Sequence, residues 1–225
     1  MELFEQHFAS IPGNLYHDTT SDTFEMFSNR GIPRHLNYRT FQKLFESMEG
    51  LKNPIILESG MASAGTNSTY LFNEYVRKYG GRFVSVDIDS GLVDKHRGNM
   101  CPATELVCDD SVHFFKEWVN THKGQKADVI YLDSFDLNSY DPDPCATHGL
   151  NEYKALLPAM QSGTLLLIDD TPATPYWIDN RGPAYYDMIK YYETNGCMPG
   201  KGMYVVKEPK NATLLLHNYQ VLYKF

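Results

Sequence analysis

Residues 55–68 of the chain read IILESGMASAGTNS. The apolar run at the start of this stretch is typical of a buried strand, and the small residues after it lead into a helical pattern with Leu71, Tyr75 and Val76. Small residues let a ligand approach the backbone closely, and the first turn of a helix offers free N–H groups. The stretch therefore predicts a strand, a ligand-binding turn and a helix, in that order.

Further apolar runs repeat this pattern along the chain. Together with residues 55–58, the predicted strands are residues 83–87, 105–108, 128–133 and 164–169. Between them, apolar residues recur at helical spacing, as in residues 112–119 and 150–160. Strand and helix in alternation are typical of a parallel sheet with helices on both faces.

The two ends of the chain differ from this pattern. Residues 34–49 carry apolar side chains at helical spacing and stop at Gly50, so we expect residues 1–50 to form a helical cap. Residues 202–206 and 213–223 are β-rich, with a turn signal between them, and predict an antiparallel hairpin within 202–225. The expected architecture is a single α/β domain over residues 1–225, with a doubly wound, mostly parallel sheet that ends in this hairpin.

Composition narrows the classes of function. The 225 residues and the 42% apolar content suffice for one core, and the net charge of -8 disfavours bulk binding of nucleic acid. The four cysteines form no Cys-x-x-Cys pair, which indicates reduced thiols. No apolar run is long enough for a signal peptide or a membrane span, so we expect a cytoplasmic protein without membrane contact. The oligomeric state stays open, a homodimer included.

Acidic residues stand at the ends of the predicted strands. They are Glu58, Asp87, Asp109, Asp110, Asp133, Asp169 and Asp170. Ligands of open α/β sheets bind beyond the carboxyl ends of the strands, so these carboxylates should surround one crevice. Any one of them, taken alone, is better explained as a helix N-cap or a loop acid. Their shared position in successive strand units favours a site.

Two common nucleotide-binding motifs do not match the turn. A dinucleotide fingerprint needs a third glycine and closer spacing, and a phosphate-binding loop needs lysine where Thr66 stands. An acid, a glycine-rich turn and a second acid at the end of the next strand resemble class I S-adenosylmethionine-dependent methyltransferases over roughly residues 54–207. The resemblance implies a Rossmann-like methyltransferase fold with a seven-stranded sheet, although the turn is one residue longer than the common version.

The same resemblance implies roles for individual residues. The residues that would line the cofactor, S-adenosylmethionine, are Glu58, Gly60, Ala62 and Gly65. Asp87 would bind the ribose hydroxyls, and Asp110 would meet the adenine amino group.

Residues 131–136 and 167–171 resemble the metal-binding elements of cation-dependent, catechol-type O-methyltransferases. Adjacent strands lie about 4.8 Å apart, so carboxylates at neighbouring strand ends can share one hard cation. Asp133, Asp169 and Asp170 are therefore predicted to bind a divalent cation such as Mg²⁺, which would lower the pKa of a substrate hydroxyl. The alternative is that water and backbone N–H groups satisfy each carboxylate separately.

The general base is not determined by this pattern. Catechol-type enzymes commonly place a lysine three residues after the first metal-binding acid, and here that position is Asp136. His148 and Glu152 lie one helical turn apart and are candidates for a ligand or a base, so Asp133 and His148 are the predicted catalytic residues. Three residues follow the last acidic strand end and are predicted to form either a substrate loop or ordinary packing. They are Tyr176, Trp177 and Arg181.

The sequence thus predicts methyl transfer from S-adenosylmethionine to an oxygen of a small molecule. A nicotinamide-dependent oxidoreductase and a catalytically silent cofactor-binding module are the alternatives, because one fold supports all three. The sequence does not identify the acceptor molecule, and it does not decide whether the acceptor atom is oxygen or nitrogen.

Overall fold

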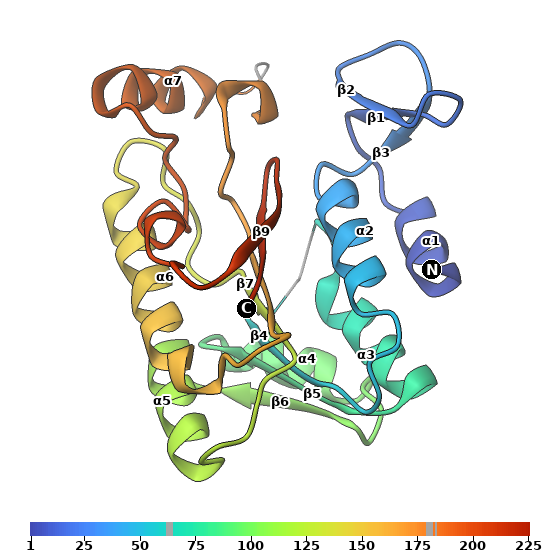
Figure 1. The fold of residues 1–225 in the computed structure, drawn as a ribbon, viewed down its shortest axis with the longest axis vertical. Helices are drawn as coiled ribbons and strands as arrows, with labels where there is room; N and C mark the ends of the chain where they lie inside the picture. Colours follow the sequence, from blue (N-terminus) through green and yellow to red (C-terminus); the bar gives the residue numbers. More distant parts are fainter. Residues whose placement is uncertain (62–64, 179–181, 183) are drawn as a thin grey trace.

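The computed structural model describes residues 1–61, 65–178, 182 and 184–225, and its centre is a seven-stranded sheet (Figure 1). The strands follow the order β6-β5-β4-β7-β8-β10-β9. Their bounds are Ile55–Ser59 for β4, Arg82–Asp87 for β5, Thr104–Cys108 for β6, Val129–Leu132 for β7, Leu165–Ile168 for β8, Thr213–His217 for β9 and Val221–Lys224 for β10. Strands β4 to β8 pair in parallel, and β10 runs antiparallel to β8 and β9. The predicted doubly wound sheet with a C-terminal hairpin is confirmed.

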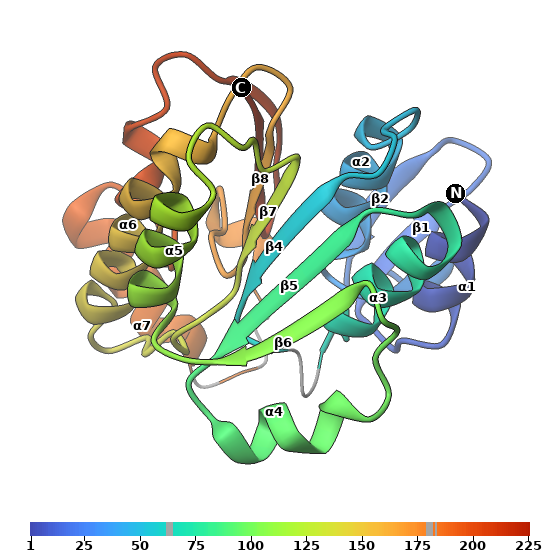
Figure 2. The same cartoon turned by 90° about the horizontal axis from the view of Figure 1, so that it is seen from below.

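Helices cover both faces of this sheet (Figure 2). Their bounds are Glu2–Ala9 for α1, Tyr38–Ser47 for α2, Ser68–Tyr79 for α3, Ser90–Arg97 for α4, Ser111–Thr121 for α5, Asp143–Leu156 for α6 and Ala184–Asn195 for α7, with short 3₁₀ turns η1 at Leu157–Ala159, η2 at Pro175–Trp177 and η3 at Val205–Lys207. Side chains alternate between the faces, so Ile56 packs in the core under α1, α2 and α3, and Leu57 packs under α5 and α6. No helix in the described part of the chain is long and apolar enough to cross a membrane.

The N-terminal 50 residues contain more than the expected helices. Besides α1 and α2, they form a small antiparallel sheet of order β2-β1-β3, with β1 at Leu15–Asp18, β2 at Thr23–Met26 and β3 at Ile32–Arg34. These strands are only three or four residues long, and no residue of β2 is fully buried. The alternation in β2 spans only four residues, which is too short to distinguish a strand from a loop, so the sequence pattern did not reveal this sheet.

The C-terminal hairpin begins later than predicted. Its turn lies at residues 218–220, between β9 and β10, rather than at residues 208–211. Residues 202–206, which the composition suggested as a strand, lead into η3 instead, and Val205 packs fully buried in the core beside α6. Burial against a helix therefore overrides the strand preference of this segment.

The parallel strands bring their carboxyl ends to one edge of the sheet. The register pairs Asp87 with Cys108 and Leu132 with Ile168, so the loops that begin at Asp133 and Asp169 leave the sheet side by side. This edge is where the strand-end acids of the sequence converge.

Candidate functional site

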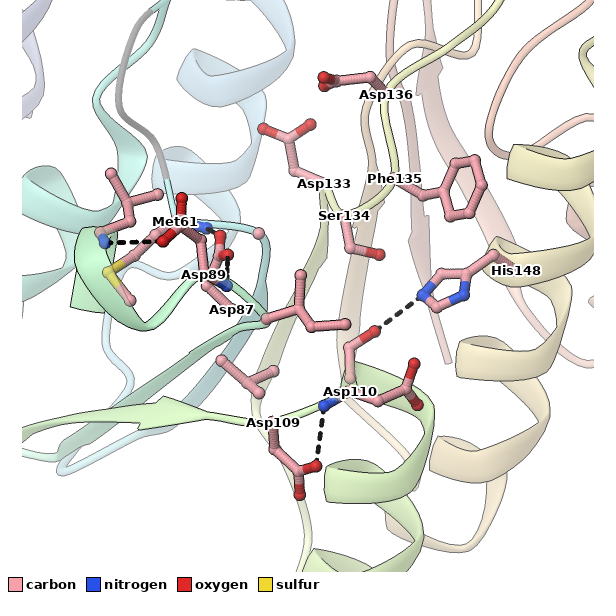
Figure 3. Close-up of a pocket in the computed structure, with 15 residues that line it drawn as sticks. Met61, Asp87, Asp89, Asp109, Asp110, Asp133, Ser134, Phe135, Asp136 and His148 are labelled. Atoms are coloured by element: carbon pink, nitrogen blue, oxygen red, sulfur yellow. Dashed lines mark hydrogen bonds between the residues drawn. The ribbon is translucent and has the colours of Figure 1, made fainter.

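A cavity of about 460 Å³ opens at the carboxyl edge of the sheet (Figure 3). Its walls come from the turn after β4, the ends of β5 and β6, the loop after β7 and one turn of α6. Acids dominate the lining: Asp87, Asp89, Asp109, Asp110, Asp133 and Asp136. So many carboxylates around one space create a negative potential that favours a cationic ligand.

The turn after β4 forms one wall of the cavity through Gly60 and Met61. Gly60 has φ of +78°, and a Cβ at this position would overlap the backbone carbonyl of Asp133. Gly65 also has a positive φ, of +68°, but no described atom lies within 4 Å of the place its Cβ would take. Ala62 lies outside the described residues. Glycine is thus required at position 60 because the turn after β4 and the loop after β7 approach each other closely. The sequence pattern had explained this glycine by the approach of a ligand.

Asp87 ends β5 and faces the cavity with a fixed carboxylate. Its Oδ2 accepts a hydrogen bond from the backbone N–H of Met61 at 2.7 Å, and its Oδ1 accepts one from Asp89 N–H at 2.8 Å. A carboxylate oxygen can accept two hydrogen bonds, so each oxygen keeps capacity for a ligand hydroxyl. This geometry fits a ribose diol, as the sequence predicts.

Asp110 and Ser111 begin α5 and form the opposite wall. Asp110 caps the helix, with its Oδ1 accepting from His113 N–H at 2.9 Å, and Ser111 Oγ lies 2.9 Å from His148 Nε2. The ring of Phe135 packs 5.5 Å from the ring of His148. These contacts place His148 with the predicted adenine-binding residues.

Half-buried His148 has a raised pKa, first because of its hydrogen bond to Glu152, while burial opposes the shift. Glu152 is itself buried, and its Oε1 accepts from Ser134 Oγ at 2.7 Å. Figure 3 shows His148 beside Phe135, with Asp133 on the other side of that loop. His148 and Asp133 line one cavity from different elements, and a shared catalytic role for them stays a prediction.

Glu58 differs from the expectation that it lines the cofactor. It is 0% exposed and is not among the described residues that line the cavity. Its carboxylate instead accepts hydrogen bonds from three hydroxyls, Ser68 at 2.7 Å, Thr69 at 2.7 Å and Ser85 at 2.6 Å. Burial raises the pKa of Glu58 to about 7, although these hydroxyls oppose the shift. Glu58 therefore ties α3 and β5 to β4 behind the turn.

Asp133, Asp169 and Asp170 converge, as the strand ends predict, and two of them, Asp133 and Asp170, contact an ammonium group. Lys201 Nζ lies 2.6 Å from Asp133 Oδ1 and 3.2 Å from Asp170 Oδ2. The side chain of Lys201 is 5% exposed. Lys201 was not predicted from the sequence, where its one signal is its position between Gly200 and Gly202, two residues that allow close packing of the backbone.

Neutral donors satisfy Asp169. Its Oδ2 accepts from the Tyr131 hydroxyl at 2.8 Å, and its Oδ1 accepts from Gln220 Nε2 at 2.9 Å and from Asp170 N–H at 2.9 Å. Asn37 Nδ2, just before α2, adds a contact at 3.3 Å. Asp169 thus joins the N-terminal region to the sheet through neutral groups.

This arrangement does not fit the predicted divalent cation. Within residues 1–61, 65–178, 182 and 184–225, no three His, Cys, Asp or Glu side chains are arranged to hold a metal ion. The positive charge beside Asp133 and Asp170 already belongs to Lys201, and the oxygens of Asp169 are engaged by neutral donors. The contacts of Asp133 and Asp170 with Lys201 differ from both accounts that the sequence allowed, a bound metal ion and separate satisfaction by water and backbone N–H groups. Asp169 does accept a hydrogen bond from a backbone N–H, that of Asp170.

This architecture has counterparts among solved structures. No protein-family model and no curated protein matches the sequence. Among solved structures, the calicheamicin methyltransferase CalS11 superposes with a TM-score of 0.53 at 12% identity, over 83% of this chain and 77% of that one. The chain shares the fold of this methyltransferase. A putative methyltransferase from Streptococcus mutans, solved with S-adenosylhomocysteine, aligns over 83% of this chain and 96% of its own, with 16% identity and a TM-score of 0.49.

In this methyltransferase fold, the loop after β8 meets the small N-terminal sheet. The hydroxyl of Tyr176, in η2, accepts a hydrogen bond from Met26 N–H at 3.1 Å. Tyr176 and Trp177 therefore lie near the N-terminal region, beyond the acid cluster at the end of β8, and Arg181 lies outside the described residues. Tyr176 is 51% exposed, and the choice between a substrate loop and packing stays a prediction.

Proposed function

We propose that the protein is an S-adenosylmethionine-dependent methyltransferase that methylates a hydroxyl oxygen of a small molecule. The observation that carries the proposal is the cavity at the carboxyl edge of the sheet, where Asp87, Asp110 and the turn at Gly60 surround one space and Asp133 stands beside it. The methyltransferase fold is consistent with this proposal but does not by itself define an activity.

The described residues suit this cofactor. S-adenosylmethionine would supply an electrophilic methyl group on a positively charged sulfur. The acidic lining favours that positive charge. Each oxygen of Asp87 accepts one backbone hydrogen bond and can accept another from a ribose hydroxyl. Asp110 and Ser111 would contact the adenine end of the cofactor, and Phe135 and His148 line the same part of the cavity.

Asp133 is the residue placed to position the acceptor. It lines the cavity from the loop after β7, and Lys201 and Tyr131 hold its carboxylate from behind. A fixed carboxylate that accepts a hydrogen bond from the acceptor hydroxyl would orient an oxygen lone pair toward the methyl group. The negative lining disfavours an anionic acceptor, so we propose a neutral or cationic one.

The proposed transfer has no step that needs a divalent cation. Assistance by a cation, which the sequence suggested, would require Asp133 and Asp170 to exchange the ammonium of Lys201 for a metal ion. Cation assistance is therefore an alternative to be tested.

Calorimetric titration with S-adenosylmethionine, S-adenosylhomocysteine and NAD, side by side, tests the cofactor. We expect the first two ligands to bind and NAD not to bind. Release of S-adenosylhomocysteine is then measured with a panel of hydroxylated small molecules and their amino analogues. Binding of NAD alone would exclude a methyltransferase, and cofactor binding without turnover on any acceptor would favour a silent binding module.

A further inference from the structure

The contacts of Lys201 set this cluster apart from a metal site. The ammonium group has three N–H donors and three acceptors in reach, which are Asp133 Oδ1 at 2.6 Å, the backbone oxygen of Asp133 at 3.2 Å and Asp170 Oδ2 at 3.2 Å. All of its hydrogen-bonding capacity is therefore directed into the cluster. A flexible surface lysine would not hold such a geometry, because it would lose side-chain entropy for exposed contacts.

The backbone around Lys201 is built to deliver this side chain. Lys201 N–H donates to the backbone oxygen of Asp170 at 3.0 Å, and Gly202 N–H donates to Thr171 Oγ1 at 2.9 Å. On the other side, α6 carries Gly149, where a Cβ would lie 2.5 Å from the carbonyl oxygen of Lys201. The segment is thus held between the loop after β8 and α6, and only a residue without a side chain fits at position 149.

Among the described residues, the remaining hydrogen-bond partners of these carboxylates are neutral groups. The Tyr219 hydroxyl donates to Asp170 Oδ1, and the Tyr131 hydroxyl lies 2.8 Å from Asp169 Oδ2 and 3.1 Å from Asp133 Oδ2. A buried carboxylate is costly unless it is paired or hydrogen-bonded, and here each one has such partners. Like-charge repulsion between the carboxylates is relieved by one fixed positive charge.

We propose that Lys201 is a built-in cation that takes the place of a divalent metal, and that it positions Asp133 for a metal-independent reaction. Lys201 acts through Asp133 and is therefore a positioning residue. The part of this inference that concerns turnover rests on the proposed methyltransferase function, whereas the part that concerns metal binding does not.

The first test uses the wild-type protein. Titration with Mn²⁺, followed by electron paramagnetic resonance, should show no stoichiometric site, and EDTA should leave methyl transfer unchanged. One tightly bound Mn²⁺ per chain, or loss of turnover with EDTA that Mg²⁺ or Mn²⁺ restores, would overturn the proposal. The Mn²⁺ titration needs no acceptor, so it decides the metal question even if the protein proves not to be a methyltransferase.

The second test removes the positive charge of Lys201. Lys201→Ala empties the space between Asp133 and Asp170, so this variant should gain a stoichiometric Mn²⁺ site. Turnover should fall on the order of 100-fold without metal, because Asp133 loses its fixed orientation. Its affinity for S-adenosylhomocysteine should stay within about threefold of the wild type, since Lys201 is not among the described residues that line the cavity. Full activity in Lys201→Ala without metal, and no Mn²⁺ site, would refute the positioning role.

Two further variants complete the design. Lys207→Met removes a lysine that is exposed on the same segment, and it should change neither metal binding nor turnover. If Lys201→Ala does not fold, the double variant Asp170→Asn with Lys201→Met keeps the charge balance of the pair. It should fold, bind S-adenosylhomocysteine and lose turnover, and wild-type turnover in it would contradict the proposal.

Discussion

Glu58→Gln separates a structural role for this acid from a cofactor-binding one. Burial raises the pKa of Glu58 from its ordinary 4.5 to about 7, so folding favours its protonated form. The stability that this group contributes is fully present below pH 4.5 and is lost as the pH rises through 7. One pKa unit corresponds to about 1.4 kcal/mol, so the free energy of unfolding should fall by about 2–3 kcal/mol between pH 5 and pH 8 through Glu58 alone.

Glutamine is always neutral, and the surrounding hydroxyls can turn to accept hydrogen bonds from its amide. Glu58→Gln should therefore match the wild type near pH 5 and be about 2–3 kcal/mol more stable than it at pH 8. Other titrating groups cancel in this difference between the two proteins.

Urea unfolding of both proteins at pH 5, 6, 7 and 8 measures the effect, with the exposed Glu117→Gln as the matched control. Calorimetry should give the same Kd for S-adenosylhomocysteine in Glu58→Gln and in the wild type. A pH-independent difference between the two proteins would refute the raised pKa. A Kd raised tenfold or more in Glu58→Gln would place Glu58 at the cofactor, where the sequence put it.

The remaining predictions concern the cavity itself. Asp87→Ala should weaken S-adenosylhomocysteine binding by about 1.5–3 kcal/mol, measured by calorimetry, because charge-assisted hydrogen bonds to the ribose are lost; an unchanged Kd in the folded variant would remove Asp87 from the site. Gly60→Val should destabilise the fold by about 1–3 kcal/mol and abolish cofactor-induced thermal stabilisation, since its side chain would overlap the Asp133 backbone. Gly65→Ala, with φ of +68° but no described atom within 4 Å of the new Cβ, should cost about 1–2 kcal/mol and keep that stabilisation. Equal behaviour of the two glycine variants in a thermal-shift assay would count against the close approach at Gly60.

The sequence by itself determined the parallel sheet and the edge at which the acids gather. Strands β7 and β8 are apolar and buried throughout, β4 and β5 are buried over most of their length, and the edge strand β6 is only partly buried. The short apolar runs of these strands can therefore be recognised without tertiary information. Parallel strands connected by helices must all end at one edge of the sheet. The positions of Asp87, Asp110 and Asp133 at the cavity follow from this local pattern.

Only the tertiary structure decided what those acids bind. Glu58 and Asp87 look alike at their strand ends, but one is enclosed by hydroxyls from α3 and β5 and the other faces the cavity. Lys201 lies 68 residues beyond Asp133 in the chain, so no local spacing could pair them. Charge compensation depends on distance in space. The sequence could therefore predict that the carboxylates need a positive charge, while the fold supplied it from the Gly200–Gly202 segment packed against α6 and the loop after β8.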